Sequence, residues 1–330
     1  MDAQAACEYF TSARVAQLRG DGEGALESLP VFLEGAPLSA GYAVQDAMID
    51  TSAGAESPLG KLVGWKIGAT NSGSQVANGF SAPFYGPLFQ SALYDHGASL
   101  WLPSLGVSFK AAEAEFCFLM GADLSGPGPF SEADCWAAVD SLYPAIELAA
   151  SRLTSSTPPV AILADGAFSG AVVLASSKQH FHTGPGLLVG LCEYSLPKSD
   201  FDPALLPTAT AELWVDGVKV ASSAGANVLG SPLTALTWLA NALAAAGHSL
   251  RKGQYVMTGA CCAVKGLTSG QTLEARFAIH DYGWKDPSTL GPDEEVDDGL
   301  RHCSQTRFGV PLSVSLHAAR EPCQPPPNSH

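Results

Sequence analysis

Two glutamates, Glu113 and Glu115, lie one residue apart in an apolar segment, residues 107–120, whose length and composition predict a mostly buried β-strand. Side chains alternate between the two faces of a strand, so both carboxylates point to the same side, with Cα atoms roughly 6.6 Å apart. The apolar side chains on the other side are Ala112, Ala114, Phe116 and Phe118. Because that side has the character of a core, we expect the two glutamates to share one site on an interior or cleft surface.

Unpaired carboxylates in such a place would be costly, because burial disfavours an isolated charge. The nearest cation in the sequence is Lys110, and strand alternation turns it to the other face. A hard divalent cation with oxygen ligands therefore accounts best for the pair, with Mg²⁺ or Mn²⁺ ahead of zinc. The spacing alone equally allows an acidic strand face in contact with water.

Glu147 is a candidate for a third carboxylate at the same site. It lies in the apolar segment 145–148, where Ile146 and Leu148 are expected to share one strand face while Glu147 takes the other. Three carboxylates on two buried strands would form a ligand set for a hard cation.

The elements that position these residues follow from periodicity and capping. Helices are predicted over residues 3–19 and from Ser39 onward, and a third helix begins after Ser131 and is ended by Pro144. The clearest helix is 232–246, with Ser231 as N-cap. Strands are predicted around a hairpin at 211–221 and over 254–259 and 271–280. We expect a helical N-terminal region (1–60), a catalytic domain (61–284) and an acidic, Pro-rich C-terminal extension (285–330) that forms an appendage.

Composition limits the classes of function. A chain of 330 residues with 46% hydrophobic residues can bury a large core. Its 17 basic and 32 acidic residues give a net charge of −15, which disfavours binding to nucleic acid or to an anionic membrane. The chain shows neither an apolar run long enough to span a membrane nor a signal peptide, so it is expected to be cytoplasmic. The 8 cysteines lack metal-site spacing, and buried free thiols are expected.

Several segments resemble one known family when they are taken together and in order. They are Gly64-Trp-Lys-Ile-Gly-Ala-Thr70, Pro83-Phe-Tyr-Gly-Pro-Leu88, Glu113-Ala-Glu115, Pro144-Ala-Ile-Glu147, Ala164-Asp165 and the stretch from Gly230 to Asn241. The resemblance is to the 2-keto-4-pentenoate hydratase and 4-oxalocrotonate decarboxylase family of the fumarylacetoacetate hydrolase superfamily. It implies an α+β, β-rich fold, a homo-oligomer, and Mg²⁺ or Mn²⁺ bound by Glu113, Glu115 and Glu147.

The resemblance also implies a chemistry for the site. A 2-oxo or 2-hydroxy acid would bind the metal through its C1 carboxylate and C2 oxygen, and hydration and decarboxylation would both pass through a metal-stabilised enolate. Lys66 would act as a cation near the substrate carboxylate or, with a lowered pKa, in proton transfer. A lysine at the surface is the alternative for Lys66, and Asp165 would either orient it or simply form a turn. Gln75 and Tyr85 are weaker candidates for substrate contacts.

Three departures from the family pattern concern the pocket. Phe84 stands where many hydratases carry an aspartate. In Asp165-Gly-Ala-Phe-Ser-Gly170, Phe168 replaces a serine expected to hold the substrate carboxylate, although Ser169 could substitute for it. The late Ser-Gly-Ser segment becomes Thr258-Gly-Ala260, with one hydroxyl fewer. We therefore predict the same enolate chemistry on a different, more apolar 2-oxo acid.

Two other functions stay open. An acylpyruvase-like C–C hydrolase would need a water-activating base, and the short Glu/His pair of such hydrolases is not evident. A non-catalytic subunit that partners an active relative is the other alternative. Retention of the three carboxylates and Lys66 argues against it, because buried like charges without a metal would destabilise the fold.

Overall fold

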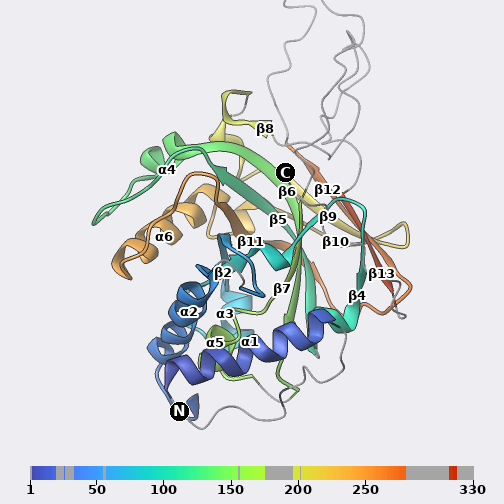
Figure 1. Ribbon diagram of the computed structural model, residues 1–330. Coiled ribbons are helices and arrows are strands. Elements are labelled where there is room, and N and C mark those ends of the chain that lie inside the picture. Colours follow the sequence, from blue (N-terminus) through green and yellow to red (C-terminus); the bar gives the residue numbers. More distant parts are fainter. Residues whose placement is uncertain are drawn as a thin grey trace, which may run out of the picture.

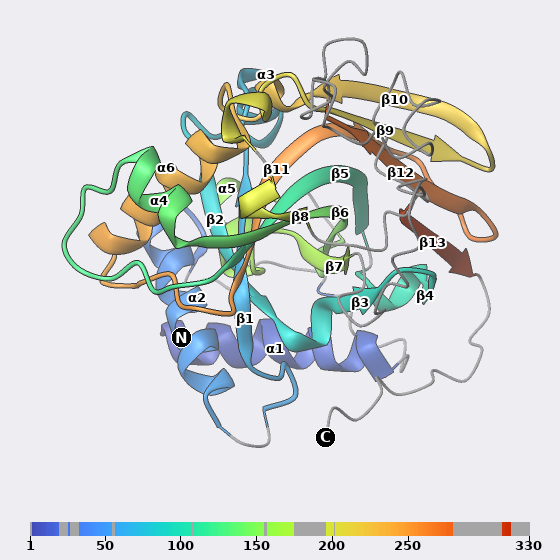
Figure 2. The same cartoon turned by 90° about the horizontal axis from the view of Figure 1, so that it is seen from above.

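The structure is a computed structural model that describes residues 2–19, 26, 33–54, 57–106, 108–154, 157–174, 196–200, 202–279 and 312–317. Two β-sheets form the main body, and helices gather at their ends (Figures 1 and 2). This is the α+β, β-rich architecture expected from the sequence.

The larger sheet carries the predicted site. Its strand order is β2 (Phe84–Phe89), β1 (Leu62–Gly68), β11 (Tyr255–Val264), β5 (Ser108–Met120), β6 (Val139–Ser151), β7 (Ser169–Leu174) and β3 (Leu93–Asp95), and β8 (Leu196–Pro197) pairs with β6. The long antiparallel pair β5–β6 places Glu113 directly opposite Glu147. The predicted strand over 107–120 and the third carboxylate on its neighbour are thus confirmed.

The second sheet covers one face of the first. Its order is β10 (Val218–Ala224), β9 (Thr210–Val215), β12 (Thr272–Ala278), β13 (Leu312–His317) and β4 (Ala98–Trp101). The main core includes Phe116 and Ile146 from the large sheet and Leu213 and Leu273 from the smaller one, so it lies between the two sheets. The glutamates alternate with these core residues along β5 and β6 and therefore project from the opposite face.

Six α-helices flank the sheets within the described residues. They are α1 (Ala3–Arg19), α2 (Leu38–Ser52), α3 (Ser72–Asn78), α4 (Glu132–Ala138), α5 (Pro159–Ala164) and α6 (Pro232–Ala245). Short 3-10 segments lie at Gln90–Ala92, Leu102–Ser104, Lys198–Asp200, Pro203–Leu205 and Gly225–Asn227. Helices α1, α2 and α5 pack together around Phe10 and Met48 at one end of the molecule (Figure 1). The N-terminal helices α1 and α2 therefore pack directly against α5, the helix that Asp165 ends.

The helix predicted after Ser131 begins where expected and ends early. Ser131 and Asp134 form a capping box at its start, but the helix stops at Ala138, and Pro144 lies inside β6. The apolar run of β6 pairs with β5 along its length, which outweighs continuation of the helix. On its other edge β6 pairs with β8 up to Leu142 and with β7 from Ala145, so among the described residues the proline lies in the gap between these two pairings.

The C-terminal boundary expected at residue 284 is wrong in one respect. Residues 312–317 are not part of an appendage, because they form β13, which pairs with β12 on one side and with β4 on the other. The rest of the expected extension, including residues 285–311, lies outside the described residues.

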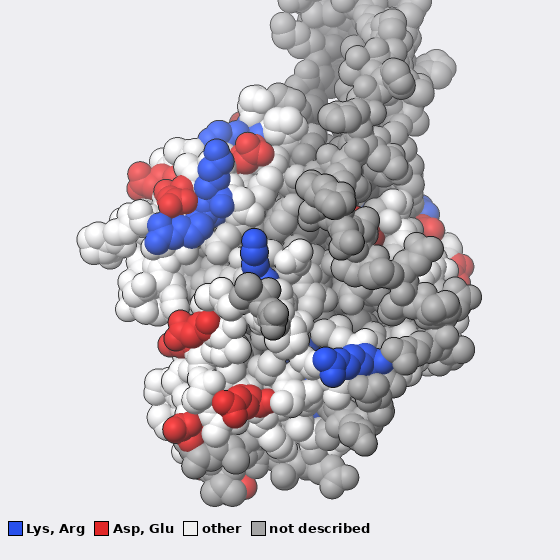
Figure 3. All heavy atoms as spheres, viewed as in Figure 1, with Lys and Arg blue, Asp and Glu red and all other residues white. Residues whose placement is uncertain are grey.

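On the face in Figure 3, a short band of basic side chains at the upper left is flanked by acidic ones, and the other charged side chains are scattered. Arg251 and Asp123, for example, form an exposed ion pair at 3.0 Å.

The stretch 225–245 has the length and hydropathy of a possible membrane span. Most of it is α6, whose residues Leu236, Leu239 and Leu243 are fully buried in the main core, as in an ordinary core helix.

Candidate active site

Three carboxylates meet on the face of the large sheet that turns away from the main core. Glu113, Glu115 and Glu147 each offer an oxygen, and these atoms lie within 4.8 Å of one another. Glu115 and Glu147 are buried and Glu113 is half-buried, so Glu113 marks the more open side. A smaller cluster of buried apolar residues, which includes Cys117, Tyr143 and Val172, shares this face.

Lys66 joins the carboxylates from a distant strand. It lies on β1, three strands away from Glu147, which in a flat sheet would place the two Cα atoms roughly 14 Å apart. Its Nζ nevertheless lies 2.5 Å from Glu147 Oε1. Coiling of the sheet, visible in the curved course of β5 and β11 in Figure 2, brings the two side chains into one concavity. Lys66 is 3% exposed, so the alternative of a surface lysine is wrong.

A backbone N–H also points into the site. Gly259 donates to Glu115 Oε2 at 2.9 Å from an irregular part of β11, where the register with β5 shifts. Its φ of +105° belongs to the region that favours glycine, and a Cβ there would lie 2.5 Å from the side chain of Thr70. The close approach therefore requires glycine, and it gives Glu115 a fixed orientation.

The residues present suit a hard divalent cation. Glu115 Oε1 and Glu147 Oε2 are buried and lack a hydrogen-bond partner among the described residues, although such atoms are nearly always satisfied. Three carboxylates and one ammonium leave two negative charges, which a divalent ion would neutralise. Carboxylate oxygens are the ligands that Mg²⁺ and Mn²⁺ prefer. The arrangement fits such an ion, with Glu113, Glu115 and Glu147 as its ligands.

Burial and mutual repulsion govern the acidity of these groups. Burial, followed by the charge of Glu147, raises the pKa of Glu113 from 4.5 to about 7. Burial, Glu147 and Glu113 raise the pKa of Glu115 well above its ordinary value. For Lys66, burial lowers the pKa, but the charges of Glu147 and Glu113 outweigh it and the net direction is upward. Without a metal on the carboxylates, Lys66 is thus a firmly held cation.

A pH dependence of stability follows for the metal-free protein. The unfolded Glu113 has the ordinary pKa of 4.5 and the folded one a pKa of about 7, so folding takes up a proton between these values. Stability present at pH 4.5 is therefore lost as the pH rises to 7, by on the order of 3 kcal/mol. Urea unfolding of EDTA-treated protein at pH 5 and pH 8 measures this. A Glu113→Gln control should show a smaller loss, and stability that instead increases with pH would contradict the assignment.

Asp165 lies near the site without touching Lys66. Its carboxylate accepts from Ser151 Oγ at 2.9 Å and forms an ion pair with Arg152 at 2.6 Å. It also ends α5, so it has a structural function at a helix terminus. Lys66 Nζ instead donates to the carbonyl of Ala167 at 2.8 Å, two residues further on. Any orienting effect of Asp165 on Lys66 is therefore indirect and runs through the loop after α5.

The two weaker candidates lie elsewhere. Tyr85 is paired with Ile67 on the face that belongs to the main core, and it contacts Trp65 and Tyr42 with ring centroids at 5.8 and 4.6 Å. Burial raises the pKa of its hydroxyl. Gln75 lies on α3 and donates to the carbonyl of Ala69 at 3.0 Å, which holds the turn after β1. The structure brings neither of them to the carboxylates.

Phe168 and Ser169 lie at the end of the loop that joins α5 to β7. The ammonium of Lys110 lies 5.4 Å above the centre of the Phe168 ring, which is a cation–π distance. Lys110 occupies an irregular position of β5, between Phe109 and Ala111, so simple strand alternation does not describe its direction. The hydroxyl of Ser169 is buried and has no partner among the described residues, which leaves it available to a ligand or a water.

An apolar group borders this loop. Phe84 stacks on Phe80 with ring centroids at 4.3 Å, and both pack with Ile162 and Ala167. Phe168 packs against the same group. The two phenylalanines that depart from the family pattern thus lie in one apolar cluster, next to the residue whose carbonyl binds Lys66.

Reasoning from the sequence missed Arg14, Arg152 and the N–H of Gly259. Arg152 is 1% exposed although it ends an apolar strand, and a charge at such a place is a signal that could have been used. The backbone donor at Gly259 has no signal beyond the glycine itself. Arg14 lies in a helix whose other charged groups are exposed, so the sequence does not distinguish it.

No family model matches the chain. A TodF product hydratase from Pseudomonas putida is 34% identical over 242 residues, which cover 73% of this chain and 81% of that protein. A 2-keto-4-pentenoate hydratase from Paraburkholderia xenovorans is 30% identical over 218 residues, which cover 66% of this chain and 72% of that protein. A 4-oxalocrotonate decarboxylase from P. putida is also 30% identical over 218 residues, which cover 66% of this chain and 74% of that protein.

Among solved structures, the 4-oxalocrotonate decarboxylase from P. putida G7, complexed with magnesium and adipate, has a TM-score of 0.69 at 22% identity and covers 95% of this chain and 97% of that one. The two-sheet fold is of the fumarylacetoacetate hydrolase type. Within that superfamily, the chain belongs to the 2-keto-4-pentenoate hydratase and 4-oxalocrotonate decarboxylase family. The family expected from the sequence motifs is thereby confirmed.

Proposed function

We propose that the protein is a divalent-metal-dependent lyase that acts on 2-oxo or 2-hydroxydienoic acids, as a hydratase or as a 4-oxalocrotonate-type decarboxylase. One observation carries the proposal, namely the two unpartnered buried oxygens of Glu115 and Glu147 beside the ammonium of Lys66. The relatives include both hydratases and decarboxylases, which supports the reaction class without choosing between them.

The residues of the site would have separate roles in the reaction. Glu113, Glu115 and Glu147 would hold the ion, and the bound ion would supply Lewis-acid stabilisation of enolate charge. Gly259 fixes Glu115, and Lys66 would present its ammonium to the carboxylate of the substrate. Burial of Glu115 and Glu147 strengthens these charge interactions. With the three carboxylates engaged as ligands and Lys66 held as a cation, proton movement to and from the substrate carbon would need a further group.

The substrate is proposed to be more apolar than the ordinary dienoate of the family. Phe84 and Phe168 lie in one apolar cluster beside the loop that contacts Lys66. In the described part of the chain, the unsatisfied hydroxyl of Ser169 is the polar group on this loop that is left for a substrate oxygen. Full turnover of 2-hydroxypenta-2,4-dienoate at a rate typical of the family would contradict this part of the proposal.

Metal removal gives the test of the function. We expect the ultraviolet absorbance of 2-hydroxypenta-2,4-dienoate, of 4-oxalocrotonate or of an apolar analogue of either to fall with Mg²⁺ or Mn²⁺ present, and the rate to decrease by at least about 10³-fold with EDTA. Loss of the dienoate identifies a hydratase, and loss of 4-oxalocrotonate alone identifies a decarboxylase. Turnover that persists at full rate in EDTA would contradict a metal-dependent lyase.

The other possibilities are outcomes of the same assay. Cleavage of an acylpyruvate would indicate the C–C hydrolase, and metal binding without turnover of any of these compounds would indicate a non-catalytic subunit. We further propose a cytoplasmic homo-oligomer that could also associate with a related family member, and size-exclusion chromatography with light scattering would measure its assembly.

A further inference from the structure

Two buried guanidinium groups converge on one carbonyl beside the site. Arg152 donates from its Nη1 to the carbonyl oxygen of Ser169 at 2.8 Å, and Arg14, which reaches in from α1, donates to the same oxygen. Arg14 is 8% exposed and Arg152 1% exposed. Arg152 also bonds the carboxylate and the carbonyl of Asp165, at 2.6 and 2.7 Å. The segment from Asp165 to Ser169 is thus held at both ends by arginine.

The backbone between these ends has an unusual conformation. Gly166, Ala167 and Phe168 have φ values of 72°, 61° and 62°, all in the left-handed region. For Ala167 and Phe168 this conformation costs on the order of 1 kcal/mol each, and it persists only where the surroundings impose it. The clamped ends supply that constraint.

This loop is in direct contact with the catalytic lysine. The carbonyl of Ala167 accepts the hydrogen bond from Lys66 Nζ at 2.8 Å, and the loop lies so close to β2 that a Cβ on Gly86 would be 2.4 Å from the Cβ of Ala167. Gly86 is the partner of Lys66 across the β1–β2 pair. The position of the Lys66 ammonium therefore depends on the loop as well as on Glu147.

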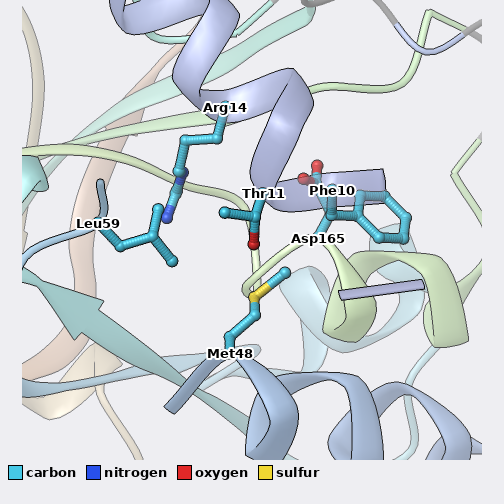
Figure 4. A pocket seen from close by; sticks show the side chains of 6 residues that line it. All are labelled: Phe10, Thr11, Arg14, Met48, Leu59 and Asp165. Carbon is cyan, nitrogen blue, oxygen red and sulfur yellow. The ribbon is translucent and has the colours of Figure 1, made fainter. Parts of the chain in front are cut away.

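The buried charges of Arg14 and Arg152 indicate that these two arginines do more than fill space in the core. Asp165 pairs with Arg152 and its charge also acts on Arg14, so among the described residues two buried guanidinium groups face one buried carboxylate here. Burial and the charge of Arg152 lower the pKa of Arg14 from 12.5 to about 9. An apolar residue at position 14 would avoid this cost, because the neighbours Phe10, Met48 and Leu59, which border the same small cavity as Arg14, are apolar (Figure 4).

We propose that Arg14 is a positioning residue of the active site, which fixes the 165–169 loop through the Ser169 carbonyl so that the Ala167 carbonyl orients Lys66. The N-terminal helix α1 then belongs to the catalytic apparatus, although none of its residues reaches the carboxylates. The role of Lys66 in catalysis rests on the proposed function, whereas the hold of Arg14 on the loop does not.

The test compares Arg14→Met with Arg19→Met, since Arg19 is an exposed arginine on the same helix. We expect Arg14→Met to raise hydrogen exchange at the amides of residues 166–169 and to lower kcat roughly tenfold to a hundredfold with a smaller change in KM. Arg14→Lys, which can still donate to the carbonyl, should recover much of both. Arg19→Met should resemble the unchanged protein.

The exchange readout separates this inference from the proposed function, because it needs no substrate. Faster hydrogen exchange of the 165–169 loop in a folded Arg14→Met protein supports the proposal that Arg14 fixes this loop, even if no turnover is found. Loop exchange and kcat that are both unaltered in folded Arg14→Met would overturn it. If Arg14→Met does not fold, the same two measurements are made on Arg14→Gln, whose shorter side chain does not span the distance to the Ser169 carbonyl. In that folded variant, unaltered loop exchange and kcat, or exchange raised equally across the whole protein, would overturn the proposal.

Discussion

Replacing Lys66 with methionine is expected to lower activity by roughly 10³-fold and to destabilise the metal-free protein by about 3–5 kcal/mol. The first effect follows from loss of the ammonium that would face the substrate carboxylate. The second follows because Glu147, 1% exposed, would keep its burial and lose its ion pair. Turnover in the dienoate assay and urea unfolding of EDTA-treated protein measure the two effects.

Metal should separate the two effects of Lys66→Met. Mg²⁺ supplies the missing positive charge, so it should restore much of the stability of the variant while its activity stays low. Lys61→Met, which removes an exposed lysine just before β1, is the matched control and should change neither quantity. A Lys66→Met enzyme with a tenth or more of the original kcat would contradict the assigned role.

Glu115→Gln is expected to act in opposite directions on activity and on stability. The amide cannot replace an anionic ligand, so Mg²⁺ affinity should fall and activity decrease by at least about 10³-fold. The metal-free protein should gain on the order of 1 kcal/mol, because repulsion from Glu147 and Glu113 disappears. The amide oxygen can still accept the hydrogen bond from Gly259, so the backbone there is expected to stay in place.

Calorimetric titration with Mg²⁺ and thermal unfolding with and without the ion measure this trade-off. Glu8→Gln, at an exposed glutamate of α1, serves as the control for removal of one negative charge. A Glu115→Gln protein that binds Mg²⁺ as tightly as the unchanged protein would contradict its assignment as a ligand. Lower stability of this variant without metal would contradict the account of the buried charges.

The fold and the carboxylates could be predicted from sequence because local patterns determine them. Alternation along β5 places Glu113 and Glu115 together, and the flanking Ile146 and Leu148 put Glu147 on a matching face. Capping residues also fixed the starts of α4 and α6, where Ser131 and Ser231 accept backbone hydrogen bonds as expected. In each case the deciding interactions lie within a few residues of one another along the chain.

The remaining features depend on contacts between distant segments. Lys66 reaches Glu147 only because the sheet coils, and Asp165 binds Arg152 rather than Lys66 because a loop of left-handed residues places a carbonyl there instead. The end of α4 at Ala138 was missed because pairing with β5 decides it. Arg14 meets Ser169 across 155 positions of sequence, and no local pattern records such a meeting.

The position of β13 has a consequence for biosynthesis. Strand β4, near residue 100, pairs in its sheet with β13, and β13 in turn separates it from β12. The ribosome must therefore release residues 312–317 before β4 can gain its neighbour, and one side of the main core stays open until then. Because exposed strand edges and apolar faces invite aggregation, the nascent chain passes through an interval in which β4 and the part of the core beside it are still uncovered. Completion of the smaller sheet therefore depends on a segment made more than 200 residues after β4, whatever the order in which the helices form.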